Sequence, residues 1–568
     1  MPKVCGNRNL FSAKAASLPL PGPPTLPDSF TGFPSVVESI AQLPTELADE
    51  IFSHLSTRHL KNLRLACVKF SKVVRPYFRF ERVFISANPR NIEVFRAVAE
   101  HETFRHAVRE IVWDDARLLE AEDYEDRFED IRLDGEESFD EESDDPVESV
   151  PWFYVRACEN NIEDLQTLGH ADFETLPQHI ETAKQVHAQL PADVAYAYYQ
   201  GLLQQQRDAL ASGTDIAALR WALDGDMFPN LQKITLTPLA HGVLFTPLYP
   251  TPMIRKFPHG FNYPIPRGWP ASPDPWTMGA ESWDSEDVKN RWRGFRLVTA
   301  LLAQQTRAKV PELVIEGNQI GSGLTADIFS RDETCKEYDD LFALVHKSGF
   351  SALTLHLMTG GQEWKSYHAF RNDRLRKLLS ANLQKVTLEL DQDRNYDFQE
   401  GWGNAGRPDL FVPLRSVFPV ESWTQLTHFG LSSFLVKQQD LLDFLRALPK
   451  TLQSLELSSL WFMKNCGSFR GLLEGIRDEL GWRGRSVRPR ISVRVDSDAH
   501  VVARKVWLDN EVGDFIYGNG ENPFPRDFTG YGLQRGVGIE KDAFEPRFER
   551  PYASRDKMVA LGHWRSNV

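Results

Sequence analysis

The sequence predicts an α/β fold, in which a small N-terminal helical unit is followed by parallel strands that are joined by crossover helices. Two observations lead to this prediction. Residues 43–67 carry apolar side chains at helical spacing, and beyond residue 81 a short strand pattern alternates with helical patterns. With 568 residues, of which 42% are hydrophobic, the chain is long enough to bury a sizeable core.

The first element is a pair of short helices near the N-terminus. Pro44 suits the first turn of a helix, because no backbone N–H is needed there. Ser56 or Thr57 can cap a second helix. A unit of this size is too small to hold a core alone, so we expect its apolar face to contact something else. The residues that share helical faces are Leu47, Ile51, Leu55, Leu60 and Leu63.

The same stretch resembles a known family. It begins with Leu43 and Pro44, continues with Glu46 and Leu47, and ends with LRLAC before Phe70. The following RPYFRFERVFIS suits a third helix that runs into a first strand. This order of residues resembles an F-box, and the further run NIEVFRAVAEHETFRHAVREIVWDDARL is similar to F-box proteins of the fungal type. His59 departs from the pattern, since Asp is commoner at that position.

The resemblance implies a function in ubiquitin transfer. An F-box docks on the Skp-type adaptor of a cullin–RING (SCF-type) ubiquitin ligase, and the remainder of the chain recruits an unknown protein substrate. The chain would then be a non-catalytic recognition subunit. One alternative is a repeat-based interaction scaffold without ubiquitin transfer, and another is a helical hairpin packed inside its own domain. The residues expected at the adaptor are Leu43, Pro44, Leu47, Ile51, Leu55, Leu60 and Leu63.

After this unit, a pattern of three apolar residues recurs. The second apolar residue follows the first by three positions, and the third follows the second by two. The alternating pair predicts a strand with one buried face, and the leading residue falls in the turn before it. This layout is typical of leucine-rich repeats, but the spacings of 40, 33, 43 and 26 residues from Val310 make it irregular. A non-repeating α/β domain is the alternative. The triplets are Val108-Ile111-Trp113, Leu231-Ile234-Leu236, Val310-Leu313-Ile315, Phe350-Leu353-Leu355, Leu383-Val386-Leu388, Leu426-Phe429-Leu431 and Leu452-Leu455-Leu457, with Ile491-Val493-Val495 as the last strand.

Helical patterns separate these strands, and two insertions interrupt the early repeats. The second insertion holds nine prolines and several aromatic residues, so it could form part of a recognition surface or a lid held by its own packing. The predicted organisation is a flexible leader at 1–39, an F-box at 40–80, a leucine-rich-repeat-like solenoid at 81–498 with insertions at 114–230 and 242–286, and a C-terminal cap or extension at 499–568.

The net charge of −14 has a local source. Residues 120–149 contain sixteen Asp or Glu against Arg127 and Arg132, which leaves the remaining chain neutral. This balance argues against a nucleic-acid partner. The acidic loop is expected to be solvated and self-repelling, although it could attract a basic partner or carry phosphate on Ser138 and Ser143.

No motif for catalysis, a metal or a cofactor is found in the sequence. The five cysteines lack metal-ligand spacing, and no apolar run approaches the ~18 residues of a membrane helix. A cytoplasmic or nuclear location is expected. Asp391 begins a calcium-loop pattern that fails at its glycine position. Asp114 and Asp115 should point to opposite faces of a strand, and His356 is expected on an exposed strand face.

Overall fold

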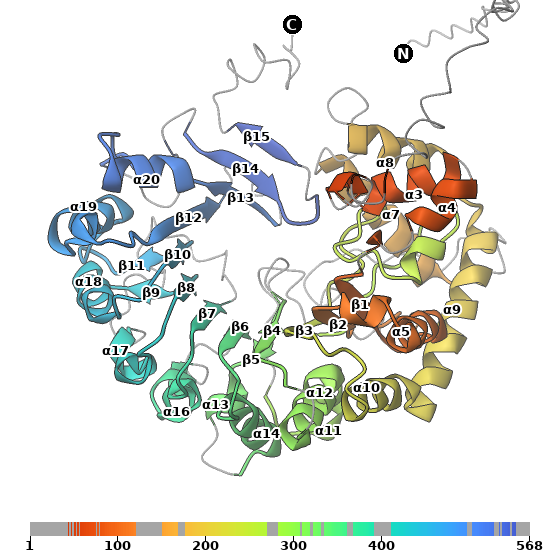
Figure 1. Cartoon of the computed structure of the whole chain (residues 1–568), viewed down its shortest axis with the longest axis horizontal. Coiled ribbons are helices and arrows are strands. Elements are labelled where there is room, and N and C mark those ends of the chain that lie inside the picture. Colours follow the sequence, from red (N-terminus) through yellow and green to blue (C-terminus); the bar gives the residue numbers. More distant parts are fainter. Residues whose placement is uncertain are drawn as a thin grey trace, which may run out of the picture. The chain divides into compact units, whose positions relative to one another are not determined.

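Figure 1 shows the computed structural model of the chain. The structure describes residues 44–120, with short gaps at 45–46, 48–49, 53, 56, 67, 75–76 and 79. It also describes 150–167, 177–269, 282–306, 309–317, 322–330, 334–359, 367–390, 411–496 and 503–526, and 533–551 with gaps at 534–536 and 546–547.

Several sequence predictions lie outside the described residues. These are the leader at 1–39, the acidic loop apart from Glu120, the calcium-like pattern that starts at Asp391, and the expected adaptor contact Leu43.

The chain divides into two units, one ending at Phe78 and the other beginning at Arg79. The first unit is helical. It contains α3 (Thr57–Ala66) and α4 (Val68–Val73), and Leu47 and residues 50–52 are also helical.

Within the described residues, the second unit is built on one sheet of thirteen strands, most of them parallel. Nine of these strands lie side by side in the same order as in the chain. One short strand branches off this row, and two others form a separate small sheet. Parallel neighbours require crossover connections, which explains why strands and helices alternate. The nine strands are β1 (Arg82–Ile85), β2 (Glu110–Asp114), β3 (Lys233–Thr237), β4 (Glu312–Ile315), β6 (Ala352–Met358), β7 (Lys385–Leu390), β8 (His428–Ser432), β10 (Ser454–Ser458) and β12 (Arg490–Asp496). The branch is β5 (Leu324–Thr325), which pairs with β6, and the separate pair is β9 (Leu435–Val436) and β11 (Trp461–Phe462).

The register of the sheet places the predicted apolar triplets opposite one another. From β2 onward the second members of the triplets are paired strand to strand, and the third members form a parallel row two residues on. Each of these side chains is buried, and so are the leading residues in the preceding turns. Together they form one continuous core with the helices. The first row is Ile111, Ile234, Leu313, Leu353, Val386, Phe429, Leu455 and Ile491.

The crossover helices lie along one side of this sheet (Figure 1). Local chemistry fixes several of their ends. Asn88 accepts a hydrogen bond from the backbone N–H of Arg90 and precedes a proline, and Ser468 caps its helix through Gly471 N–H at 3.1 Å. The helices are α5 (Pro89–Glu100), α10 (Thr214–Asp224), α11 (Glu286–Arg291), α12 (Arg293–Gln304), α13 (Asp327–Ser330), α14 (Lys336–Val345), α16 (Arg374–Leu379), α17 (Leu414–Val417), α18 (Gln438–Ala447) and α19 (Phe469–Glu479).

The first insertion contributes to two cores. Helices α7 (Trp152–Thr167) and α9 (Ala192–Ser212) form a separate aromatic-rich cluster, which includes Tyr154, Tyr199, Phe261 and Tyr263. By contrast, α10 packs Leu219 and its neighbours into the main core, so the last helix of the insertion acts as a crossover helix.

The C-terminal region corrects one prediction. β12 is not the last strand, because β13 (Arg504–Trp507), β14 (Ile539–Asp542) and β15 (Glu549–Pro551) extend the sheet in antiparallel fashion. The helix α20 (Asp509–Tyr517) lies between β13 and β14 in the chain. A buried hydrogen bond, with His179 Nε2 2.9 Å from Glu545 Oε2, joins this region to α8 (Pro177–His187) of the first insertion.

The mixed α/β class and the parallel strands with crossover helices are therefore confirmed. Among the described residues, no helix is both long and apolar enough to span a bilayer, and no group of three metal-ligating side chains comes together.

Candidate functional site

The helical unit before Phe78 has its own interior. Phe52 meets the ring of Phe70 edge to face, with centroids 6.2 Å apart, and lies 5.3 Å from the ring of Tyr77. The guanidinium of Arg64 lies over the ring of Phe78 at 5.9 Å. Such edge-to-face and cation–π contacts add to the energy of burial and fix the helices against one another. Leu60 is 1% exposed, so it belongs to the buried side chains of this unit.

Other apolar side chains of this unit face outward. Leu47 is 53% exposed and Ile51 44%, and since they are four residues apart they share one helical face. Leu65 and Val68, where α3 gives way to α4, are 78% and 77% exposed. Large exposed apolar groups that gather in one place mark interaction surfaces. In the described residues five such groups fall in this unit (with Val73) and four in the much larger second unit.

The predicted contact residues therefore separate into classes. Pro44, Leu47 and Ile51 are exposed, whereas Leu55 and Leu63 are half-buried and Leu60 is buried. Sequence reasoning missed Leu65 and Val68, although LRLAC was part of the motif. The helical period could have flagged them, because neither falls on the face of Leu60 and Leu63.

Positive charge is concentrated in the α3–α4 part of this unit. The segment from Thr57 to Val73 contains five Lys or Arg and no Asp or Glu. Lys61 and Arg64 are exposed on α3, the helix that also carries Leu65. The α3–α4 part therefore combines the exposed Leu65 and Val68 with basic side chains, which favours an acidic partner that also buries apolar groups, whereas the segment of Leu47 and Ile51 carries Glu46, Asp49 and Glu50.

The comparison with known families agrees with this geometry. Residues 40–77 match the family model of the F-box domain. An F-box domain is present in this chain. F-box domains bind Skp-type adaptors within SCF complexes, which gives the chain a general role in substrate recognition by these ligases, and F-box proteins are typically non-catalytic subunits. No curated protein matches the chain.

Outside the F-box, the second insertion is held down by buried polar contacts. Asp115 accepts hydrogen bonds from the indole N–H of Trp269 at 2.8 Å, the backbone N–H of Gly294 at 2.9 Å and the indole N–H of Trp113 at 3.3 Å. Asp114 faces different partners and caps the N–H of Ala116 at 3.1 Å. Burial raises the pKa of Asp114 to about 8.

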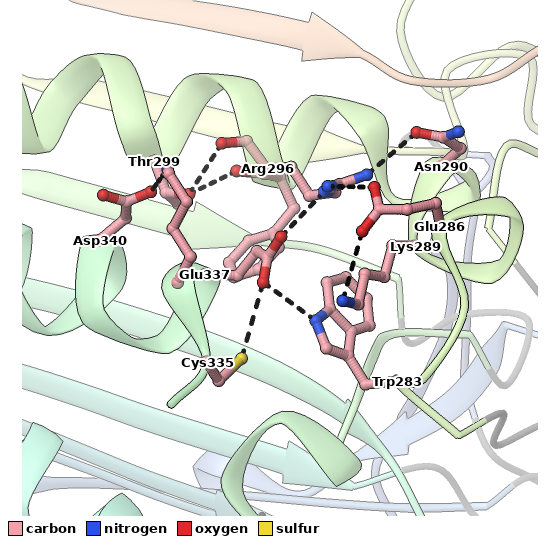
Figure 2. A network of polar contacts seen from close by, with 11 residues as sticks. Trp283, Glu286, Lys289, Asn290, Arg296, Thr299, Cys335, Glu337 and Asp340 are labelled. Atoms are coloured by element: carbon pink, nitrogen blue, oxygen red, sulfur yellow. Dashed lines mark hydrogen bonds and ion pairs between the residues drawn. The ribbon is translucent and has the colours of Figure 1, made fainter. Parts of the chain in front are cut away.

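A second network fixes the end of the same insertion (Figure 2). Glu337 Oε2 accepts a hydrogen bond from the indole N–H of Trp283 at 3.2 Å, and its Oε1 accepts one from Arg296 Nε at 3.0 Å. Arg296 also donates to Glu286 at 2.8 Å and Asn290 at 3.0 Å. Burial alone would raise the pKa of Glu337, but hydrogen bonds from its backbone and Trp283, with the charge of Arg296, lower it.

These contacts show how several aromatic residues of 242–286 are placed. Phe261, Tyr263, Trp269 and Trp283 are buried, so within the described residues they act in packing. Cys335, beside Glu337, is also buried, and burial raises the pKa of its thiol. It therefore stays protonated and is a poor nucleophile.

His356 corrects another prediction, because it is only 7% exposed. It lies on the sheet face away from the crossover helices, where Glu389 and Arg494 occupy the equivalent row. Its Nδ1 accepts a hydrogen bond from the backbone N–H of Gly317 at 3.0 Å, which places the proton on Nε2, and the Nε2 atom lies 3.6 Å from Glu389 Oε2. Arg494 Nη2 donates to the same Glu389 oxygen at 2.6 Å. Burial lowers the pKa of His356 to about 4.

Proposed function

We propose that this chain is a substrate-recruiting subunit of an SCF-type ubiquitin ligase. Its F-box binds the Skp-type adaptor, a cullin joins through that adaptor, and the second unit binds a target protein. The chain makes no bond itself; it holds a target lysine near the ubiquitin-charged enzyme, which raises the effective concentration there.

The exposed pair Leu47 and Ile51, inside a matched F-box domain, is the observation that carries this proposal. Half-exposed leucine and isoleucine on one helical face are typical anchors for a partner, where a few apolar residues contribute most of the binding energy. Pro44, Leu55, Leu63 and Leu43 would extend the contact. The basic field of α3 favours an acidic adaptor surface and fast association at low salt.

For the second unit we infer an irregular leucine-rich-repeat-like array. The support is the repeated register of the apolar rows, and the recurrence of one backbone contact before each strand. Gln384 N–H donates to Ser351 at 2.7 Å, Thr427 N–H to Gln384 at 2.7 Å, and Gln453 N–H to Thr427 at 2.8 Å. Such arrays offer extended surfaces for protein partners. A fungal type and a cytoplasmic or nuclear location complete the proposal.

The test is affinity purification of the full chain, followed by identification of bound proteins with and without proteasome inhibition. The expected result is an adaptor and a cullin together, with a further partner that becomes ubiquitinated. An adaptor without a cullin, and no ubiquitinated partner, would favour the scaffold function instead.

A further inference from the structure

The loop between α19 and β12 is one of the most basic short segments of the described chain. Residues 481–490, GWRGRSVRPR, contain four arginines and no acid. We name this segment the arginine turn. It begins at Gly481, whose φ of +65° suits glycine, and it is anchored by Trp482, which is fully buried. In Figure 1 it connects α19 to β12, close to α20.

Two of the four arginines are used by the fold. Arg483 donates from Nη2 to the carbonyl of Gly518 at 2.8 Å, and from Nε to the carbonyl of Ile516, so it caps the end of α20. Arg490 Nη2 donates to Asp509 at 2.5 Å, and Ser492 holds the other oxygen of that carboxylate at 2.6 Å.

Arg485 and Arg488 remain. Within the described residues neither forms an ion pair, and Nη1 of Arg485 is buried without a hydrogen-bond acceptor. Arg488 uses only its Nε, which donates to the carbonyl of Arg483 at 3.1 Å. A guanidinium has five N–H donors, so the donors of the exposed Arg488 other than Nε–H, and those of Arg485 outside the buried Nη1, are available to a ligand.

Three carboxylates on the helices that flank the turn already have cationic partners. Asp478 is bound by Arg477 through contacts of 2.8 and 2.9 Å, and Glu479 lies 3.0 Å from Arg446. Asp509 is bound by Arg490. Within the described residues, the charges of Arg485 and Arg488 are therefore not paired with a carboxylate, unlike that of Arg490.

Aromatic rings hold the two arginines in place. Arg485 lies over the ring of Trp482 at 5.2 Å, and Arg488 over the ring of Tyr517 at 5.8 Å. The Tyr517 hydroxyl donates to the carbonyl of Pro489 at 2.7 Å, which fixes that ring. Stacking limits the freedom of each side chain before a ligand arrives, and this lowers the entropic cost of binding. Val487, 51% exposed, lies between them in the chain.

We propose that the arginine turn binds an acidic segment of the target protein, through carboxylate or phosphate groups on Arg485 and Arg488 and an apolar contact on Val487. Guanidinium groups on aromatic supports match carboxylate and phosphate oxygens in charge and hydrogen-bonding capacity. This inference rests on the proposed function, because it names the chemistry of the target that the second unit recruits.

The test is fluorescence anisotropy with the full chain and four short labelled probes. They are a peptide rich in Asp and Glu, a phosphoserine peptide, the corresponding Gln and Ser peptide, and a single-stranded oligonucleotide of similar charge. We expect one or both anionic peptides to bind, and the neutral peptide to fail. The anionic peptide that binds more tightly shows whether the arginine turn prefers carboxylate or phosphate groups.

The double variant Arg485→Glu/Arg488→Glu should bind at least about tenfold more weakly, since each charge-assisted contact is worth about a factor of ten or more. Arg488→Glu alone, on an exposed side chain, should give an intermediate loss and guards against misfolding of the double variant. The matched control is Arg156→Glu/Lys184→Glu, which makes the same charge change at exposed positions on α7 and α8 and should bind like the parent.

Equal weakening in both double variants would overturn the proposal, as would a preference for the oligonucleotide or no binding of either anionic peptide. Binding that emerges only after removal of residues 121–149 would assign the arginine turn to the chain's own acidic segment and overturn a target role. Adaptor co-purification is measured on every variant. If the chain co-purifies with the adaptor but binds neither anionic peptide, only this inference is rejected. If the parent chain does not co-purify with the adaptor, the proposed function is rejected.

Discussion

Replacement of Leu47 or Ile51 is the most direct perturbation of the F-box surface. Complete burial of such a side chain is worth about 1.5–3 kcal/mol. Since Leu47 is 53% exposed and Ile51 44%, about half of that value, roughly 1 kcal/mol, remains for a partner to gain. Leu47→Ala or Ile51→Ala should therefore weaken adaptor binding about fivefold.

An aspartate at either position should have a larger effect. It removes the apolar contact and also places a carboxylate in the interface, which costs several kcal/mol when no partner is present. We expect Leu47→Asp and Ile51→Asp to abolish co-purification with the adaptor. Because both side chains are already exposed, the thermal stability of the free chain should change little.

The assay is co-expression with the adaptor, affinity capture of the chain and titration of the purified pair. The matched control is Val194→Asp, which introduces the same charge at a residue that is 49% exposed on α9. If both F-box variants retained parental adaptor binding, our reasoning about the exposed face would be refuted. Loss of binding in the Val194 variant would show that charge, rather than the F-box face, decides the outcome.

Three further predictions concern stability. His356→Gln should reduce the loss of stability that the parent shows on acidification. The buried neutral imidazole stabilises the fold fully above its unfolded pKa of about 6.5, and this stabilisation is lost as the pH falls toward its folded pKa of about 4, by about 2 kcal/mol at pH 5. Urea titrations at pH 7 and pH 5 would contradict this if the difference in unfolding free energy between parent and variant were the same at both pH values. Glu337→Ala should cost about 2–3 kcal/mol in urea unfolding, because buried donors of the network lose their acceptor. Glu286→Gln, at the exposed end of the network, should cost clearly less, and equal costs in the two variants would argue against the network. Gly294→Ala should destabilise α12, since a Cβ there would lie 2.4 Å from the Trp113 indole nitrogen. Gly201→Ala on α9, where a Cβ would have no atom within 4 Å, should instead raise the free energy of unfolding by about 0.5–1 kcal/mol. Thermal melts in which both variants shifted the melting temperature in the same direction would reject this account.

The strands of the second unit could be predicted because their alternation directly records burial. Leu353 and Leu355, for instance, face the helices, and nothing in their surroundings competes with that pattern. The same alternation misled the prediction for His356. Alternation shows that a side chain lies on the second face of a sheet, but not whether that face is covered, and here Glu389 and Arg494 accompany the histidine into a buried row.

The C-terminal strands could not be predicted for a related reason. Arg504 points into a buried site because Asp542 pairs with it at 2.8 Å, and the two residues are far apart in sequence. A polar residue that is buried by a distant partner breaks the apolar period on which sequence reasoning depends. In the F-box, the period grouped Leu47 with Ile51, but exposure could be assigned only when the packing of Phe52 was known.

The His179–Glu545 pair has a practical consequence for the limits of any shortened chain. Each side chain is only 1% exposed, although 366 residues separate them. A chain that stopped after β12 would contain every predicted repeat, yet it would deprive an imidazole in the first insertion of its carboxylate. The shortened chain would then be destabilised in the first insertion, hundreds of residues before the point of truncation. The C-terminal strands should therefore be kept together with that insertion.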